Sequence, residues 1–359
     1  MTTTRTIPVA HLVISLIVLV LTPVANVQAC ENSSVSVEGA VVRVFTSRSL
    51  VQDADCRWTA WIERSLGSVA DISGRFPVDR VTIFLDRSRG SQPVAYGWVR
   101  RNNPPEVHLR VFPAATLDDL LDDWRGYHEF AHLLLPFVGN RDIWFAEGLA
   151  SYYQHFLQAR AGVIDSEQSW QRLVAGFQRG LDDPAGRGES LDSLSPKMWS
   201  ERAFRRVYWT GAAFFLRVDY RLRLASDGEH TLDTTLAAFQ DCCMSGDGSR
   251  ANRYKSRWDA EAMVAELGKL SLSEIWQEEY QRTIEQLAEP DFGEAGEYLG
   301  LRIQSGQIVM DTDRRYRDRR KSLALGEGFD PVPAESGQAA LIDELEEVSG
   351  FLVDRGPAP

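Results

Sequence analysis

The chain has 359 residues, of which 44% are apolar, 10% aromatic and 25% charged, and its formal net charge is −12. This composition is typical of a globular protein that is long enough to bury a substantial core. Because nucleic-acid binding requires clustered lysine and arginine contacts to phosphates, the acidic balance argues against a nucleic-acid partner.

The first 29 residues have the features of a secretory signal peptide. Arg5 precedes an apolar run from Val9 to Ala25, and the small residues Val27 and Ala29 allow cleavage before Cys30. We therefore expect an exported protein, either periplasmic or extracellular. A cysteine at the first mature position also leaves open a lipid anchor on that residue, which is the one route to a membrane that we expect.

The cysteine count fits an exported chain. The sequence contains Cys30, Cys56, Cys242 and Cys243, and an even number favours disulfides outside the cytosol. A bond between Cys30 and Cys56 would tie the mature N-terminus to the first helix, unless Cys30 is lipidated. The adjacent Cys242 and Cys243 are expected to pair only with difficulty, so their state stays open.

The predicted strands precede most of the predicted helices. Alternating, valine-rich sequence predicts a strand over Val35–Phe45, and helical spacing follows over 53–74. Two further strands are expected at Asp79–Asp86 and Glu106–Phe112, with a loop rich in Gly and Pro between them. A small sheet followed by helices is an α+β arrangement.

The remaining chain is predicted to be mainly helical. The expected helices share apolar residues at helical spacing and cover Thr116–Leu135, Phe145–Arg160, Glu167–Leu181, Arg205–Leu224, Thr231–Phe239, Asp259–Leu267 and Leu272–Leu287. We divide the mature chain into a sheet with a metal-binding core (30–160), a helical subdomain that completes the active site (161–303), and a basic linker with a poorly ordered tail (304–359). The basic run RRYRDRR at Arg314–Arg320 is interpreted as a solvated face or linker.

The stretch YHEFAHLLLP, from Tyr127 to Pro136, contains an HExxH pattern. Residues four apart lie above one another on a helix, so His128 and His132 can direct ring nitrogens at one zinc ion. Glu129 lies one step round the helix, where it can act as general base towards a water molecule. An amphipathic helix that contains two histidines by chance is the alternative interpretation.

Glu147 is the candidate third ligand. Two histidines leave a tetrahedral ion short of protein ligands, and Glu147 follows His132 by 15 residues. Pro136 and Gly139 end the first helix and leave room for a turn before the next one. A glutamate in the apolar stretch WFAEGLA is costly to bury unless it is paired or bound to a metal. By contrast, His155 is interpreted as a surface residue.

Tyr208 is the candidate for stabilising the transition state. It lies in RRVYWTGAAFFLRVDYRLR (Arg205–Arg223), and a positioned phenol can stabilise the oxyanion that forms when a peptide carbonyl is attacked. An ordinary core tyrosine is the alternative. His108 in a strand and His230 in a polar turn are interpreted as structural.

Taken together, HEFAH, WFAEGLASYY and YWTGAAFFLRVDYRLR resemble the gluzincin metallopeptidases. The sequence is most similar to the glycyl aminopeptidase-like family, with aminopeptidase N and leukotriene A4 hydrolase as more distant relatives. The resemblance implies a thermolysin-like zincin catalytic domain with one zinc ion and a peptide substrate. It also implies that His128, His132 and Glu147 bind the metal, that Glu129 is the general base, and that Tyr208 stabilises the transition state.

Two questions stay open from the sequence. The region AYGWVRRNNPPEVHLRV resembles the aminopeptidase substrate loop at Tyr96–Gly97 but has no acidic residue before Glu106, so aminopeptidase and endopeptidase both remain. The strand EVHLRVF is expected to offer an edge to an extended substrate. The alternative to an enzyme is an inactive, zinc-stabilised scaffold that binds a partner at the cell surface.

Overall fold

The computed structural model describes residues 32–50, 57–244 and 258–328. The predicted signal peptide, Cys30, Cys56 and the last 31 residues lie outside this part of the chain. No helix within the described ranges is long and apolar enough to cross a bilayer.

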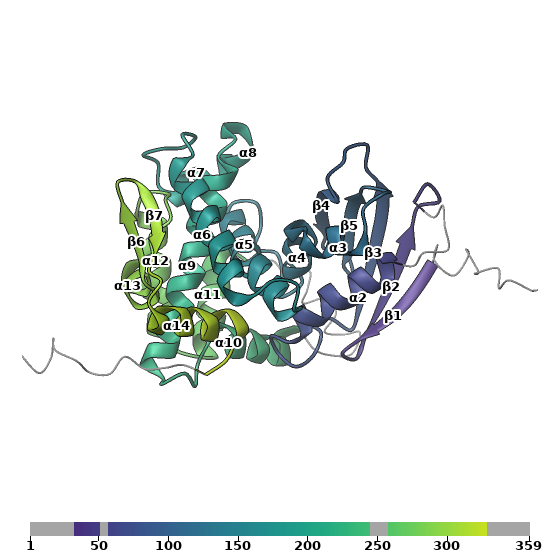
Figure 1. Ribbon diagram of the computed structural model, residues 1–359. Coiled ribbons are helices and arrows are strands. Elements are labelled where there is room, and N and C mark those ends of the chain that lie inside the picture. The colour runs from purple at the N-terminus through teal and green to yellow at the C-terminus, as the bar shows by residue number, and fades with distance from the viewer. Residues whose placement is uncertain (1–31, 51–56, 245–257, 329–359) are drawn as a thin grey trace, which may run out of the picture.

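A five-stranded sheet forms one side of the molecule (Figure 1). Its strands, in spatial order, are β1 (Asn32–Val37), β2 (Ala40–Thr46), β3 (Arg80–Arg87), β5 (Glu106–Val111) and β4 (Val94–Arg100). The three central strands are parallel, whereas β1 and β4 are antiparallel to their neighbours. Burial alternates along β2, so one face of the sheet is covered and the other is open.

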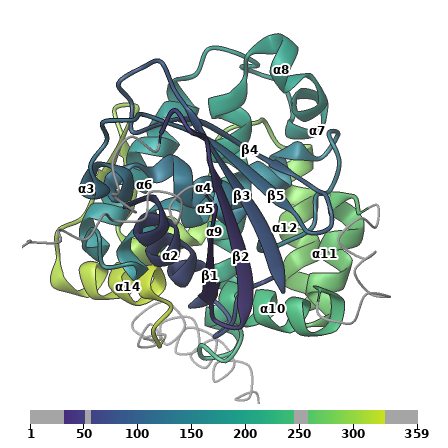
Figure 2. The same ribbon diagram turned by 90° about the vertical axis from the view of Figure 1, so that its right-hand side faces the viewer.

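The helices gather on the covered face, behind the strands in Figure 2. They are α2 (Arg57–Ala70), α3 (Leu117–Asp122), α4 (Trp124–Ala131), α5 (Ile143–Arg160), α6 (Ser166–Asp182), α7 (Leu191–Leu194), η1 (Ser195–Lys197), α8 (Met198–Glu201), α9 (Phe204–Ala225), α10 (Leu232–Phe239), η2 (Gln240–Met244), α11 (Ala260–Lys269), α12 (Ser273–Glu285), α13 (Gly293–Leu299) and α14 (Arg314–Leu325). The α+β arrangement predicted from the sequence is therefore present.

Two strand predictions were wrong in detail. The strand expected at Val35–Phe45 is a hairpin, because Glu38 and Gly39 adopt positive φ angles of 41° and 87° and reverse the chain. The loop expected between β3 and β5 contains the edge strand β4. Most β4 residues are partly exposed, so they show no clear apolar alternation.

The helix predicted over Thr116–Leu135 is two helices that meet at Asp123. This residue has extended backbone angles (φ −76°, ψ 115°), and its side chain caps α4 by accepting a hydrogen bond from the Arg125 amide. A second oxygen of the same carboxylate accepts a bond from the Val94 amide on β4. Asp123 therefore fixes the start of α4 against the edge of the sheet.

The centre of the molecule is the pair of long helices α5 and α9. Helix α4 lies between the sheet and α5 in Figure 1, and α9 packs on the other side of α5. A Cβ atom added at Gly148 would lie 2.5 Å from the Gly211 carbonyl carbon, so only glycine allows this helix spacing.

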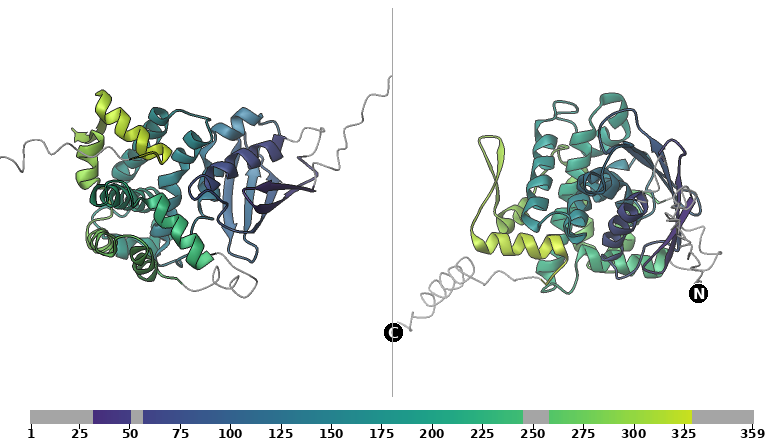
Figure 3. Two further views of the ribbon diagram at one scale, coloured as in Figure 1. Left: turned by 90° about the horizontal axis from the view of Figure 1, so that it is seen from below. Right: turned by 45° about the vertical axis from the view of Figure 1, so that its right-hand side comes forward.

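The basic stretch after residue 304 is not a linker. The chain forms a hairpin of β6 (Leu301–Gln304) and β7 (Gln307–Met310) at this point, and α14 follows. These elements cover the end of the helical part opposite the sheet (Figure 3). Arg320, in the basic run, is fully buried and its guanidinium pairs with Glu167 on α6. Charge alone suggested a solvated face, but the side chain of this arginine is buried and paired with a partly exposed glutamate.

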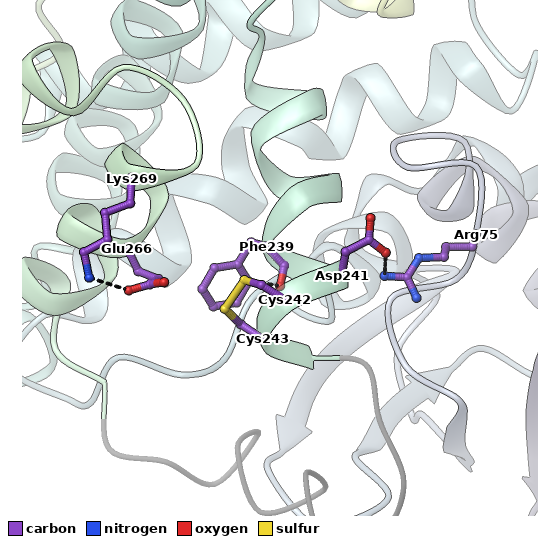
Figure 4. The surroundings of a disulfide bond; sticks show 7 residues. All are labelled: Arg75, Phe239, Asp241, Cys242, Cys243, Glu266 and Lys269. Carbon is purple, nitrogen blue, oxygen red and sulfur yellow. Dashed lines mark hydrogen bonds and ion pairs between the residues drawn. A yellow bond between two sulfur atoms is a disulfide. The ribbon is translucent and has the colours of Figure 1, made fainter.

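The structure joins Cys242 and Cys243 in a disulfide within η2 (Figure 4). The sequence left the state of these two neighbours open, and the structure pairs them within the turn over Gln240–Met244. Asp241 beside them forms an ion pair with Arg75 at 2.7 Å. No free cysteine occurs in the described residues.

Candidate metal centre and active-site cleft

Helix α4 carries the HExxH residues. His128 lies within the helix, and His132 follows as its C-cap with near-helical backbone angles (φ −62°, ψ −13°). Both side chains are buried, and the two residues are 6% and 8% exposed. The predicted one-turn spacing therefore places both imidazoles on the same side of the helix.

Helix α5 adds Glu147 to the two histidines. Its Oε2 atom lies 3.1 Å from Nε2 of His128 and 3.7 Å from Nε2 of His132. Donors about 2 Å from a tetrahedral zinc ion lie roughly 3.3 Å from one another. The three donor atoms therefore fit a zinc ion, and their type, two imidazoles and one carboxylate with a side open to the cleft, matches catalytic zinc sites.

The charges of these groups depend on one another. Burial and the neighbouring His128 lower the pKa of His132 to about 3, although Glu147 opposes this shift. For Glu147, burial alone would raise the pKa, but both histidines and the Tyr208 hydroxyl lower it to about 2. Burial also opposes protonation of His128, yet the hydrogen bond and charge of Glu147 raise its pKa overall. The site therefore holds an ionised carboxylate and a neutral His132 at neutral pH.

Glu129 lies beside the donor atoms and beneath strand β4. A Cβ atom added at Gly97 on β4 would lie 2.4 Å from Cγ and 2.9 Å from Oε1 of Glu129. The absence of a side chain at Gly97 therefore makes room for the Glu129 carboxyl. Burial raises the pKa of Glu129 to about 7, against the opposing charge of His128. Its pKa in the metal-free protein is thus suited to accepting a proton near neutral pH.

Tyr208 reaches the same place from α9. Its ring stacks on His128, with centroids 5.9 Å apart and planes 12° from parallel. Its hydroxyl forms a hydrogen bond with Glu147, and burial together with that negative charge raises the tyrosine pKa above its ordinary value. The phenol therefore stays protonated and can donate to an oxygen in the cleft.

These groups open into a cleft of about 370 Å³ between β4, α4 and the helices beyond. Tyr96 on β4 and Trp199 on α8 both line it and are more than half exposed, at 56% and 57%. The strand beside the cleft is β4, whereas β5 lies inside the sheet between β3 and β4. The expectation that EVHLRVF (Glu106–Phe112) offers the edge was therefore wrong, because the unpredicted strand β4 covers it.

All five predicted site residues line this one cleft: His128, Glu129, His132, Glu147 and Tyr208. His155 is 2% exposed and hydrogen-bonded to glutamine side chains, so its interpretation as a surface residue was wrong. His108 is buried between the rings of Phe84 and Trp98, as a structural residue would be.

One residue of the site was missed. Gln154 accepts a hydrogen bond from His128 at 3.0 Å. Two helical turns separate it from Glu147, so it projects from the same face of α5. The seven-residue spacing between Glu147 and Gln154 in the sequence could have indicated that Gln154 lies near the metal ligands.

Comparison with known proteins agrees with the motifs. A family model described as M61 glycyl aminopeptidase matches residues 138–212, a segment that contains Glu147 and Tyr208. A comparison with curated proteins found no match.

Similarity to solved structures concerns the fold. An aminopeptidase N family protein from Idiomarina loihiensis has 15% sequence identity and a TM-score of 0.55, and the alignment covers 76% of this chain and 49% of that one. An M1 zinc metallopeptidase from Deinococcus radiodurans has 17% identity and a TM-score of 0.45, with 72% and 53% covered. The chain thus spans about half the length of these structures. The family model confirms the predicted resemblance to glycyl aminopeptidase-like metallopeptidases, and the aminopeptidase N family structure supports a similar fold.

Proposed function

We propose that this chain is a zinc-dependent metallopeptidase that hydrolyses peptide bonds. The observation that carries the proposal is the convergence of two imidazoles, one carboxylate, a second carboxyl of raised pKa and a phenol in a single cleft. When bound, zinc would polarise the peptide carbonyl and make a water molecule more acidic. His128, His132 and Glu147 would hold one zinc ion.

The other groups supply proton transfer and orientation. Glu129 takes the proton from the attacking water and returns it to the leaving amine. Tyr208 donates a hydrogen bond to the carbonyl oxygen as negative charge builds on it. The free edge of β4, beside Glu129, pairs with the backbone of an extended substrate.

We further propose that cleavage does not depend on a free amino terminus. An aminopeptidase needs an acidic or amide group to hold the substrate α-ammonium. Among the described residues that line the cleft, the acidic side chains are Glu129 and Glu147, both assigned to other roles, and the cationic ones are Arg101 and Arg125. Matched peptides with free and acetylated amino termini test this, and strict dependence on the free amine would contradict it.

Two variants test the main proposal. Glu129→Gln should abolish turnover of a mixed peptide library but retain one zinc ion, because it removes a base and not a ligand. Glu147→Ala should lose zinc. Zinc bound to the wild type without any cleavage would instead favour the inactive scaffold, and zinc retained by Glu147→Ala would remove that residue from the ligand set.

Export is the remaining part of the proposal. It rests on the apolar N-terminal run, and the even cysteine count is consistent with it. Expression of the full chain in a bacterial host, followed by fractionation and mass measurement, would show whether cleavage precedes Cys30 and whether that residue carries lipid.

A further inference from the structure

A line of buried polar side chains leads from His128 into the protein interior. Nδ1 of His128 lies 3.0 Å from Oε1 of Gln154, whose Nε2 lies 2.9 Å from Nε2 of His155. Nδ1 of His155 in turn lies 3.0 Å from Oε1 of Gln158. No member of the line is more than 6% exposed, so water does not compete for these contacts.

The far end of the line fixes the direction of every hydrogen bond. Nε2 of Gln158 lies 2.8 Å from the Asp122 carbonyl oxygen, which can only accept, so this nitrogen is the donor. Oε1 of Gln158 must then accept from a protonated Nδ1 of His155. Neutral His155 therefore has a bare Nε2, which accepts from Gln154. The remaining Gln154 oxygen must accept from His128.

We propose that Gln154, His155 and Gln158 are positioning residues that hold His128 in the tautomer with Nδ1 protonated. In the metal-free protein Nε2 of His128 donates to Oε2 of Glu147 at 3.1 Å. Because Nδ1 keeps its own proton, loss of the Nε2 proton on metal binding would leave the Nε2 lone pair free for the metal. The inference rests on the proposed metal site, but it concerns the orientation of one ligand and not the reaction.

The four hydrogen bonds all donate in the same direction, away from the metal site and towards the last carbonyls of α3. Hydrogen bonds aligned in this way polarise one another. Donation from Nδ1 to an amide oxygen makes the opposite ring nitrogen a better metal ligand. This line of hydrogen bonds would therefore both orient the His128 ring and strengthen the bond between its Nε2 and a metal ion.

The second histidine lacks this support. Nδ1 of His132 is buried and has no hydrogen-bond partner among the described residues. The ring of Trp124 packs edge-on to both His128 and His155, with centroids 5.9 and 6.4 Å away. Orientation by buried hydrogen bonds is thus concentrated on one of the two imidazoles.

Nitrogen-15 NMR of the histidine side chains tests the direction of the chain. In the full-length protein, two-bond nitrogen–proton correlations should show neutral His155 with its proton on Nδ1, the less common tautomer in water. With zinc bound, His128 should also carry its proton on Nδ1. A proton on Nε2 of His155 would reverse the direction derived above and overturn the proposal.

Zinc affinity tests the consequence. Gln154→Met should weaken zinc binding by roughly 10- to 100-fold, and Gln158→Met, remote from the metal, should weaken it by a smaller factor. The matched control is Tyr153→Phe at the neighbouring position on α5. It removes a partly buried hydrogen bond in which the Tyr153 hydroxyl donates to Asp233 at 2.6 Å. A zinc affinity of Gln154→Met within twofold of that control would overturn the proposal.

These readouts separate the inference from the proposed activity. If the wild type binds zinc but cleaves no peptide, the proposed function fails while tautomer and affinity still decide the inference. If the wild type binds no zinc, the His155 tautomer in the metal-free protein decides it. If Gln154→Met does not fold, the wild-type spectra and the zinc affinity of Gln158→Met still test the proposal. Normal zinc affinity of Gln158→Met, together with a proton on Nε2 of wild-type His155, would contradict the proposed line of hydrogen bonds.

Discussion

Burial of Glu129 makes the stability of the metal-free protein depend on pH. Its pKa is about 7 in the folded protein and near 4.5 without the fold, so the folded state binds the extra proton between these values. The contribution of this group to stability is therefore highest at low pH and is lost as pH rises through 7. Above that pH the folded protein holds a buried, ionised carboxylate.

Glu129→Gln should accordingly stabilise the metal-free protein at pH 8 relative to pH 5. The unfolding free energy of the variant minus that of the wild type should increase by about 2–3 kcal/mol from pH 5 to pH 8. This follows from the rise of the Glu129 pKa from 4.5 to about 7 on folding. Urea unfolding with a chelator present measures it. A difference that stays constant from pH 5 to pH 8 would show that the Glu129 carboxyl is not desolvated.

Tyr208→Phe should reduce turnover by roughly two to three orders of magnitude, because it removes one donor to the developing oxyanion. Zinc content should stay at the wild-type level, since the phenol is not a ligand. Tyr220→Phe, on the same helix but outside the cleft lining, is the control and should turn over normally. Near-normal rates for Tyr208→Phe would exclude this tyrosine from the mechanism.

At this scale the sequence predicted which side chains meet in one cleft, because their positions depend on spacing along helices; their catalytic and metal-binding roles stay predictions. His128 and His132 need only one helical turn between them, and Glu147 needs only a second helix that returns. The role of His155 could not be predicted. Its partners Gln154 and Gln158 are near in sequence, but the carbonyl of Asp122 that sets the hydrogen-bond direction comes from another helix.

At the scale of elements, the distance between α5 and α9 decides whether the site forms. Glu147 and Tyr208 come from these two helices, which approach closely at Gly148 and Gly211. Gly148→Ala would place its Cβ 2.5 Å from backbone atoms that cannot rotate away. The helices must then separate, and the Glu147–Tyr208 hydrogen bond must lengthen.

Gly148→Ala should therefore lower the unfolding free energy by about 1–3 kcal/mol and also reduce turnover. Gly67→Ala is the matched control, since Gly67 lies in helix α2 with open space around its missing Cβ. That change should stabilise by up to about 1 kcal/mol through helix propensity. Urea unfolding and peptide hydrolysis of both variants measure the two effects, and equal stability of the two would contradict the close approach.

Elements were predicted correctly where buried residues recur at a regular spacing in the sequence. They were missed where no such spacing exists. Helices α5, α6 and α9 were predicted within about two residues, because each has apolar residues at helical spacing. Strand β4 was missed because it lies at the sheet edge with most residues partly exposed. The break at Asp123 was also missed, since a single capping aspartate does not interrupt the apolar pattern.

At the scale of the whole molecule, the C-terminal elements were the least predictable. Helix α14 has a strongly basic sequence, and Arg320 contacts both Leu299, 21 positions earlier, and residues of α6 that are 150 or more positions earlier. Arg320 donates to both carboxylate oxygens of Glu167 at 3.1 Å and to the Leu299 carbonyl at 2.9 Å. The indole nitrogen of Trp170 donates to the Arg320 carbonyl at 2.6 Å. No local pattern shows that one arginine of such a run will be fully buried.

Arg320→Ala should lower the unfolding free energy by roughly 2–3 kcal/mol, because it leaves Glu167 and a buried carbonyl without their donor. The value lies at the low end for a buried pair, since 32% of the Glu167 side chain is exposed and keeps some solvation. Arg317→Ala, three residues earlier on the exposed side of α14, should change stability by no more than about 0.5 kcal/mol. Turnover at low temperature should stay near normal in both, because α14 does not line the cleft. Urea unfolding followed by circular dichroism gives the comparison, and equal midpoints for the two variants would mean that α14 is not anchored through Arg320.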